Sequence, residues 1–291
     1  MDLVALRIFK TVAEEGGITR AAAKLHRVQS NVTTRVRQLE ERLGARLFLR
    51  QNRKLVLSPE GKVLLAYADQ MLRLSSEAEA ALRKGAPSGT LRIGTMESTA
   101  GTRLPPVLSR YHGTYPQVRI ELVTGTSGAL VARLAGYEIE AAFVADPARP
   151  EQFDAQAAFD EELVLIAART AAPIKSPRDI DENTLIAFGT GCSYRRRLEE
   201  WLAHAGAKPV RVMEFQSYHA IVACVAAGAG IAIVPRSVIA SVFADKQVKL
   251  YPLPARIARA KTQLIWRKGH RSAALDALRE EVSKSAKRSE R

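Results

Sequence analysis

Basic side chains concentrate near the amino end of the chain, where they could bind phosphates. Residues 20–54 contain ten Lys or Arg residues against Glu40 and Glu41, which leaves +8 of the formal net charge of +14 in the 291-residue chain. Such a field attracts a polyanion by displacing its counterions. The overall excess alone also fits a merely basic surface, whereas its concentration in one segment favours nucleic acid. The basic residues within 284–291 lack apolar spacing and predict a solvated tail.

Residues 29–43 suggest a second chemistry, hydrogen bonding to the edges of bases. Val32, Val36, Leu39 and Leu43 recur at helical intervals, which predicts a helix with one buried face, and Gly44 ends it. Polar side chains lie on or beside the opposite face: Gln29, Ser30, Asn31, Thr33, Thr34, Arg35, Arg37 and Gln38. Because a helix fits the major groove, these residues predict a recognition helix.

The segments around this helix predict a helix-turn-helix with a wing. A first helix is indicated by apolar residues at every third position, Leu3, Leu6, Phe9 and Val12. Gly16-Gly17 ends that helix, Thr19 caps a second one over 20–25, and 26–28 form a tight turn. The apolar runs 47–50 and 55–57 flank a basic tip and predict a hairpin. Helical triplets with a basic face also occur in protein-binding domains, but the turn, polar helix and basic hairpin together favour DNA.

A long helix is predicted after Ser58, which can cap it, and Pro59, which suits its first position. It runs to about residue 84, or ~39 Å at 1.5 Å per residue. A heptad-like seam follows it, at Leu64, Ala68, Met71, Ser75, Ala78 and Leu82. The seam predicts a dimerising linker helix; the alternative is a long helix that lies on its own domain. Residues 86–89 predict a short hinge.

From residue 90 onward, strands and helices alternate, which predicts an α/β region with largely parallel sheets. The expected strands are 91–95, 118–123, 141–144, 163–167, 185–188, 210–215, 231–234 and 262–266. The expected helices include 104–111, 129–134, 195–205, 220–226 and 272–283. About 200 residues of this pattern suit two similar subdomains better than one. Ligands of open α/β sheets bind at the carboxyl ends of the strands.

The chain resembles the LysR-type transcriptional regulators over essentially its whole length. The matching N-terminal pieces are GGITRAAAKL, QSNVTTRVRQLEERLGARLF and LSPEGKVLL, and the later ones are LRIGTMES, GYEIEAAFV, AAGAGIAIVP and TQLIWR. GCSYR and SYHAIVACVAAG also resemble the branch that includes regulators of glutamate synthase type. Val28 stands where the family commonly has a capping Ser or Thr, so Ser30 is an alternative cap, and Glu140 stands where Asp is frequent.

The resemblance implies an α/β protein with an N-terminal all-α winged helix-turn-helix and a C-terminal region of two α/β lobes, similar to type 2 periplasmic binding proteins. The implied domains are the winged helix-turn-helix at 1–58, the linker helix at 59–85, the hinge at 86–89 and the effector region at 90–291. The first lobe would comprise about 90–161 and 267–291, and the second about 162–266.

Residue roles follow from the same resemblance. Gln29, Ser30, Asn31, Thr33, Thr34 and Arg37 are expected to face DNA, Arg35 and Arg50 to contact phosphates, and Arg53 and Lys54 to lie on the wing. The implied partners are a double-stranded operator, further copies of the chain in a homodimer or homotetramer, and RNA polymerase as a candidate. Leu64, Ala68, Met71, Ala78 and Leu82 would form the dimer contact.

The effector cleft implied by the resemblance would be lined by four strand-to-helix loops. Their candidate residues are Met96, Glu97, Ser98, Thr99, Thr126, Ser127, Cys192, Ser193, Tyr194, Tyr218 and His219. Hydroxyls and free N–H groups at helix starts suit an anion, so a carboxylate-bearing metabolite is expected. Glu97 could instead favour an amine. Alternatively, the Ser and Thr residues are helix caps that need no ligand.

Two other classes of function are weaker. The C-terminal fold alone would suit a solute-binding protein, but the N-terminus lacks an export signal and no apolar run reaches the ~18 residues of a membrane span, so a cytoplasmic protein is expected. No nucleophile, phosphate-loop or metal-ligand motif suggests an enzyme, a metal site or a cofactor. Three arginines follow Cys192, which predicts a lowered pKa of its thiol and allows a redox switch with Cys224. Alternatively, Cys224 is an inert residue of the apolar core.

Overall fold

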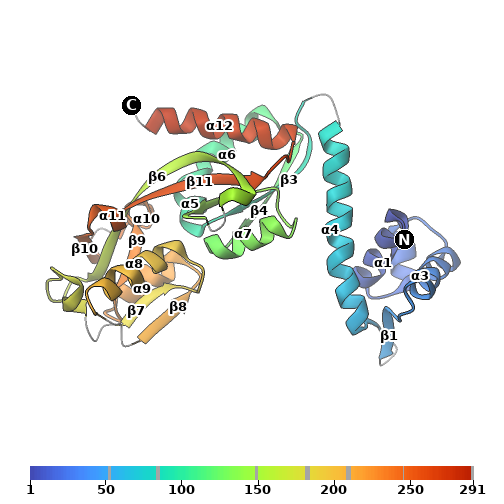
Figure 1. Ribbon diagram of the computed structural model, residues 1–291, viewed down its shortest axis with the longest axis horizontal. Coiled ribbons are helices and arrows are strands. Elements are labelled where there is room, and N and C mark those ends of the chain that lie inside the picture. The colour runs from blue at the N-terminus through green and yellow to red at the C-terminus, as the bar shows by residue number, and fades with distance from the viewer. Residues whose placement is uncertain are drawn as a thin grey trace. The chain divides into compact units, whose positions relative to one another are not determined.

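The chain folds into two compact units, Met1–Arg83 and Lys84–Arg291. The computed structural model (Figure 1) describes residues 1–51, 54–82, 86–147, 150–180, 184–207, 211–244 and 246–289. The division between the units falls in the segment predicted as linker and hinge. The mixed α/β class and the N-terminal helix-turn-helix, both expected from the sequence, are confirmed.

The N-terminal unit is a helix-turn-helix with a two-stranded wing. It contains α1 (Leu3–Glu15), α2 (Ile18–Lys24), α3 (Gln29–Leu43), β1 (Phe48–Gln51), β2 (Lys54–Leu57) and α4 (Pro59–Leu82). Leu6, Phe9 and Val12 of α1 pack with Val36 and Leu39 of α3 in one core. The helical spacing of the apolar residues therefore produces the buried face that it predicts.

The ends of these helices follow the sequence signals except at the start of α2. Gly44 adopts the left-handed conformation at the end of α3, and Ser58 Oγ accepts a hydrogen bond of 2.8 Å from Gly61 N at the start of α4. The predicted cap Thr19 is wrong, because α2 already begins at Ile18, after Gly17. Leu3 is 43% exposed and lies outside the buried face of α1.

Half of the predicted seam of α4 is used inside its own unit. Ala68 is fully buried, so the prediction that it contacts a second chain is wrong. Leu64 and Met71 pack against the same core but stay partly exposed. The physical reason is that the short helices cannot enclose their core without α4, which contacts α1. Ala78 and Leu82 are exposed, as the prediction requires.

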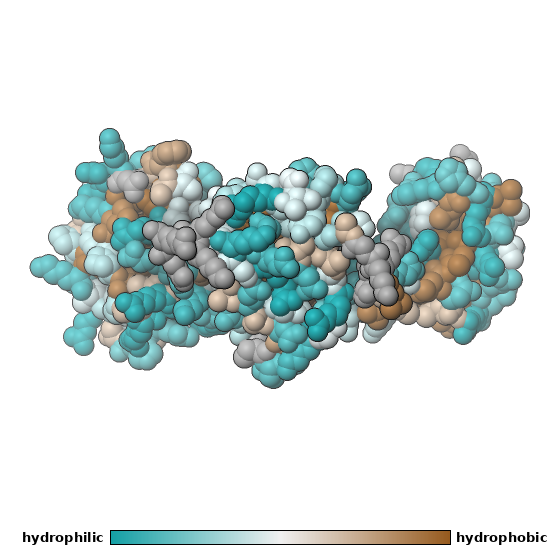
Figure 2. Space-filling view, turned by 90° about the horizontal axis from the view of Figure 1, so that it is seen from above, coloured by the Kyte–Doolittle hydropathy of each residue, from teal (hydrophilic) through white to brown (hydrophobic). Residues whose placement is uncertain are grey.

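The exposed apolar residues of α4 are offset by one position from the predicted seam. Val63, Tyr67 and Leu74 are 60%, 59% and 50% exposed. Their spacing of four and seven keeps them on one side of the helix. Figure 2 shows an apolar area on the surface of the N-terminal unit, on the right of the view.

The C-terminal unit consists of two lobes joined by two long strands. Its strands are β3 (Gly89–Thr95), β4 (Val118–Thr124), β5 (Ala141–Ala145), β6 (Phe153–Ala168), β7 (Thr184–Phe188), β8 (Arg211–Phe215), β9 (Ala232–Pro235), β10 (Val248–Pro252) and β11 (Arg259–Arg267). Its helices are α5 (Glu97–Thr102), α6 (Leu104–Thr114), α7 (Ser127–Ala135), α8 (Ser193–His204), α9 (Tyr218–Ala226), α10 (Arg236–Ser241), α11 (Ala255–Ala258) and α12 (Ala273–Ser289), with 3-10 turns at Pro150–Gln152 and Pro177–Ile180.

Strands β6 and β11 cross between the lobes. Residues 153–162 of β6 pair with β11 in the first lobe, and residues 163–168 pair with β9 and β10 in the second. Because β11 pairs antiparallel with β5 from Thr262 to Trp266, the chain returns to the first lobe near Arg259. This crossing precedes the predicted boundary at 267. The pairs β3–β4, β3–β5 and β7–β8 are parallel, but the crossing strands are antiparallel, so the sheets are mixed and not largely parallel.

Side chains of β5 alternate between the two faces of the first-lobe sheet. Phe143 packs in the core that contains residues of α6 and α12, whereas Val144 packs in the core that contains residues of α7. Figure 1 shows α12 and α7 on opposite sides of this sheet. This layering leaves the start of α7 at the end of the sheet that meets the second lobe.

Candidate functional site

Helix α3 presents most of the predicted DNA-facing residues to solvent. Gln29, Ser30, Asn31, Thr34 and Arg37 are exposed. Thr33 and Arg35, which were predicted with them, are half-buried. The extended residue Val28 precedes the helix without a side-chain cap, so α3 begins at Gln29 and Ser30 lies inside it. The alternative cap at Ser30 is therefore wrong, and the polar surface starts in the first turn of the helix.

Two polar contacts limit what this surface can do. Thr33 Oγ1 donates to Gln29 O at 3.0 Å, so its hydroxyl remains an acceptor rather than a donor for another group. Asn31 Oδ1 accepts a long, exposed hydrogen bond from Arg27 Nη1 at 3.4 Å. The amide nitrogen of Asn31 then points away from Arg27 and remains a donor.

Glu40, near the end of α3, positions the start of the wing. Its Oε1 accepts hydrogen bonds from Leu47 N at 2.7 Å and Phe48 N at 3.3 Å. The sequence interpretation counted Glu40 only as a charge, and no local motif indicated this contact. Arg50 is exposed on β1. Arg53 and the side chain of Lys54 lie outside the described residues.

In the C-terminal unit, the four predicted loops converge on one small cavity between the lobes. It is lined by Met96, Glu97, Ser98, Gly125, Thr126, Ser127, Phe188, Cys192, Ser193, Tyr194 and Tyr218. Nine of the eleven predicted residues are among them. The two exceptions are Thr99, which is fully buried, and His219, which is exposed. Phe188 was missed, although it ends β7 and its ring lies 4.7 Å from that of Tyr218. Its place at the carboxyl end of a strand was the available signal.

Direct contacts between the lobes close this cavity to about 20 Å³. Ser193 Oγ of the second lobe donates to Ala145 O of the first at 2.9 Å, and Ser127 Oγ lies 2.8 Å from Ser193 Oγ. Gly128 N also donates to Gly191 O at 3.1 Å. Since this volume holds about one water molecule, a metabolite enters only if the lobes separate.

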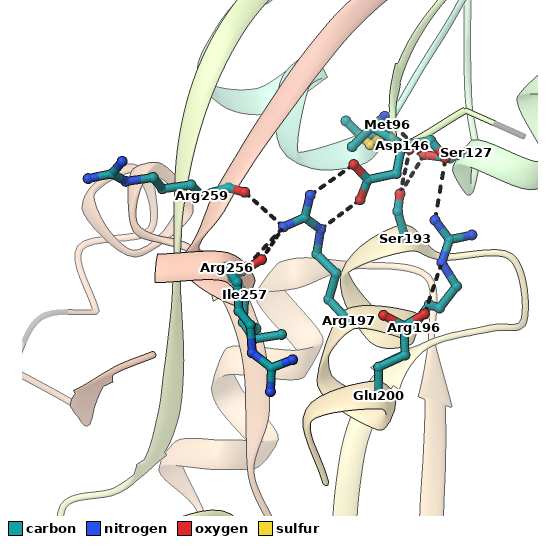
Figure 3. Close-up of polar contacts among 11 residues, drawn as sticks. Met96, Ser127, Asp146, Ser193, Arg196, Arg197, Glu200, Arg256, Ile257 and Arg259 are labelled. Atoms are coloured by element: carbon teal, nitrogen blue, oxygen red, sulfur yellow. Dashed lines mark hydrogen bonds and ion pairs between the residues drawn. The ribbon is translucent and has the colours of Figure 1, made fainter. Parts of the chain in front are cut away.

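A bidentate ion pair links the lobes beside the cavity (Figure 3). Arg197 Nε and Nη2 of α8 lie 2.6 and 2.8 Å from the two carboxylate oxygens of Asp146, which follows β5. Arg197 Nη1 also donates to Arg259 O at 2.8 Å and Ile257 O at 3.2 Å. We call this arrangement of Arg197 and Asp146 the latch. It was not predicted, because partners 51 positions apart leave no local pattern in the sequence.

The carboxyl of Glu97 and two tyrosine hydroxyls have shifted pKa values in the cavity. Glu97 Oε1 of the first lobe accepts from Tyr218 N at the start of α9 at 3.3 Å. Burial raises the pKa of the Glu97 carboxyl, and the Tyr218 N–H and His219 only partly oppose this. Burial likewise raises the pKa values of the Tyr194 and Tyr218 phenols, so both stay protonated.

The cysteines do not support the predicted redox chemistry. Burial raises the pKa of the Cys192 thiol and outweighs the effect of Arg195 and nearby N–H groups, so the expected lowering of its pKa is wrong. The predicted fall neglected desolvation, which disfavours a thiolate. Cys224 packs at the edge of the apolar core, and both thiols are free.

A larger cavity of about 1050 Å³ lies along the crossing strands, and the latch residues Asp146 and Arg197 are among those that line it. Charged side chains line it, including the pairs Arg103–Glu161 and Arg236–Glu162. No sequence motif indicated it. Within the described residues, no helix is long and apolar enough to cross a membrane, and no group of three His, Cys, Asp or Glu side chains could hold a metal ion.

Comparisons with known proteins place both units in one family. Residues 3–62 match the bacterial regulatory helix-turn-helix protein, lysR family, and residues 84–287 match the LysR substrate binding domain. The chain is 41% identical over 264 residues to the uncharacterized HTH-type transcriptional regulator YusT of Bacillus subtilis strain 168, with 90% of this chain and 88% of that protein covered. It is 38% identical over 269 residues to the HTH-type transcriptional regulator GltR of the same strain, with 92% and 91% covered.

A solved structure agrees over both units. Full-length CbnR complexed with its target DNA is 25% identical with a TM-score of 0.70, and the match covers 98% of this chain and 100% of that one. Both relatives are named as transcriptional regulators. The chain belongs to the LysR family: it is a DNA-binding transcriptional regulator in which a helix-turn-helix is joined to an effector-binding domain.

Proposed function

We propose that the exposed face of α3 reads an operator while the wing holds the DNA backbone. The observation that carries this is the row of exposed polar residues in the first turns of α3, within the most basic segment of the chain. Gln29, Ser30, Asn31, Thr34 and Arg37 contact base edges. Thr33 takes part as an acceptor only. Arg35 and Arg50 contact phosphates, and the sequence-based assignment places Arg53 and Lys54 on the wing.

Substitution of Arg37 tests the assignment. The operator is first located by footprinting on genomic DNA, and affinities are then measured by fluorescence anisotropy at one fixed salt concentration. Arg37→Ala should cost about 1–3 kcal/mol of operator binding and relax the preference for sequence. The matched control is Arg119→Ala, which removes an exposed positive charge from the other unit. Equal operator affinity for Arg37→Ala and wild type would remove α3 from the interface.

Two copies of the chain pair through the exposed side of α4. Val63, Tyr67 and Leu74 form an apolar row there, and the exposed Ala78 and Leu82 continue it toward the end of the helix. Burial of such a row stabilises a dimer by about 25 cal/mol per Å² of apolar surface. A dimer supplies two reading helices for an operator with two half-sites, and pairing of effector domains would extend it to a tetramer. RNA polymerase is a further proposed partner on the DNA, and the cytoplasm the proposed location.

A small polar molecule in the cavity between the lobes controls DNA binding. The convergence of four loops from both lobes supports this, since a ligand there changes how the lobes meet. Such regulation of DNA binding requires that the effector bind the two arrangements of the lobes with different affinity. The redox alternative loses its support because burial raises, rather than lowers, the pKa of the half-buried Cys192 thiol. The solute-binding alternative does not account for the helix-turn-helix.

A further inference from the structure

The inter-lobe cavity contains a cluster of buried hydroxyls whose contacts with one another fall short of good hydrogen-bond geometry. Ser98 Oγ and Tyr194 OH both line it, both residues are 2% exposed, and neither atom makes a hydrogen bond within normal geometric limits. Thr262 Oγ1 interacts with Tyr194, but this contact too falls short of good hydrogen-bond geometry. An unsatisfied buried hydroxyl costs about 1–3 kcal/mol. These atoms therefore favour a ligand that brings polar groups into the cavity.

The charge of the cavity selects the kind of polar group. Among the described residues that line it, Glu97 has the one formally charged side chain, and no Lys or Arg is present. A carboxylate placed beside Glu97 would meet a like charge in a poorly solvated space. An ammonium group would instead neutralise Glu97 and donate its other N–H bonds to hydroxyl oxygens.

The helix start that would attract an anion is already occupied. Glu97 Oε1 lies 3.3 Å from Tyr218 N, so this carboxylate from the first lobe sits at the N-terminus of α9 in the second. Carboxylates are stabilised at that end of a helix by its dipole. The position that a carboxylate ligand would take at α9 is therefore taken by a side chain of the protein itself, and Glu97 bridges the two lobes.

We propose that the effector carries an ammonium group that pairs with Glu97. The hydroxyls of Ser98 and Tyr194 form hydrogen bonds with polar atoms of the effector. The ligand class is a small amine or an α-amino acid. This inference rests on the proposed function, in which the cavity is the effector site. Met96, Phe188 and Tyr218 supply apolar surface for the rest of the molecule.

Matched ligands that differ only in their charged groups test the proposal. Isothermal titration calorimetry on the full chain uses two sets: L-leucine, 3-methylbutylamine and 4-methylpentanoate, and L-alanine, ethylamine and propionate. In at least one set we expect the amine or the amino acid to bind, and the acid to bind at least about tenfold more weakly, as expected for loss of a hydrogen-bonded charge pair. Binding of an acid as tightly as its amine partners, or no saturable binding by any of the six at millimolar concentration, overturns the proposal.

Two variants locate the binding. Glu97→Gln should weaken the amine-bearing ligand by at least about tenfold. Glu151→Gln, which changes an exposed acid outside the cavity, should leave its affinity unchanged. In a Cys224→Ala background, the ligand should also protect the Cys192 thiol from alkylation. Unchanged affinity in Glu97→Gln, or no protection of Cys192, overturns the assignment. Operator binding by the free chain is measured separately, so a failure here is distinct from a failure of the proposed function.

Discussion

The latch between Arg197 and Asp146 should set how readily the lobes separate. Replacement of Arg197 by Ala removes the two ion-pair contacts to Asp146 at 2.6 and 2.8 Å and the bond to Arg259 O at 2.8 Å. These three bonds end on the first lobe or on the strand that returns to it, whereas Arg197 belongs to α8 of the second lobe. The substitution also removes the longer bonds of Arg197 to Arg256 O and Ile257 O in α11, at 3.3 and 3.2 Å. The substitution therefore acts on the closed arrangement more than on either lobe alone.

The size of the effect follows from the geometry and the exposure. Hydrogen bonds to charged groups contribute about 1.5–3 kcal/mol each when buried. The side chains of Arg197 and Asp146 are 17% and 31% exposed, so solvent screens part of the attraction. We expect a net loss of about 2 kcal/mol for the closed arrangement. That corresponds to a roughly 30-fold larger population of open molecules, because each 1.4 kcal/mol is a factor of about ten.

Alkylation of Cys192 measures this population, since the thiol lines the closed cavity. With Cys224→Ala as background and the reagent limiting, Arg197→Ala should accelerate modification of Cys192 by about 30-fold. The control Arg92→Ala breaks an ion pair of 2.8 Å with Glu121 that lies wholly in the first lobe, and should leave the rate unchanged. Equal acceleration by both variants, or none by Arg197→Ala, would refute the role of the latch.

Three further outcomes are expected. Gly61→Ala would place its Cβ against the carbonyl oxygen of Leu47, so it should destabilise the N-terminal unit by about 1–3 kcal/mol in calorimetric unfolding, whereas Gly113→Ala, with open space around it, should not. Burial raises the pKa of Glu97 above 4.5, so the native state holds that proton more tightly than the unfolded chain does. The free energy of unfolding should therefore fall as pH rises from 4.5 through the raised pKa. In Glu97→Gln, the free energy of unfolding measured by urea titration should fall less steeply with pH. Leu74→Lys should convert dimers to monomers in sedimentation velocity, and a dimer of unchanged stability would exclude this side of α4 from the contact.

Local patterns predicted the elements of the fold well because periodicity and capping act over a few residues. The apolar spacing of α3 and the signals at Gly44 and Ser58 all correspond to observed features. Which chain covers an apolar seam is a tertiary question that spacing cannot answer. The position of Ala68 in the pattern fits a dimer seam and a domain core equally well. Ala68 lies in the domain core because the small N-terminal unit needs α4 to close that core.

The candidate site shows the same division. Loops at the carboxyl ends of strands predicted most of the cavity, since topology brings those ends together. The latch and the contact of Glu97 with Tyr218 N could not be predicted, because they depend on the distance between two lobes. The pKa of Cys192 was predicted in the wrong direction, because neighbouring arginines are visible in a sequence and burial is not.

The two crossings between the lobes are adjacent strands of one ladder, and this restricts the motions available to the protein. β6 and β11 pair antiparallel from Phe153 with Arg267 to Glu162 with Arg259, with a shift in register between Thr262 and Gln263. A ribbon of this kind resists stretching and sliding, because either would break its hydrogen bonds, but it bends and twists easily. The lobes can therefore turn relative to each other while their spacing at the ribbon stays constant. A ligand in the cavity therefore acts on the angle between the lobes and not on their spacing at the ribbon.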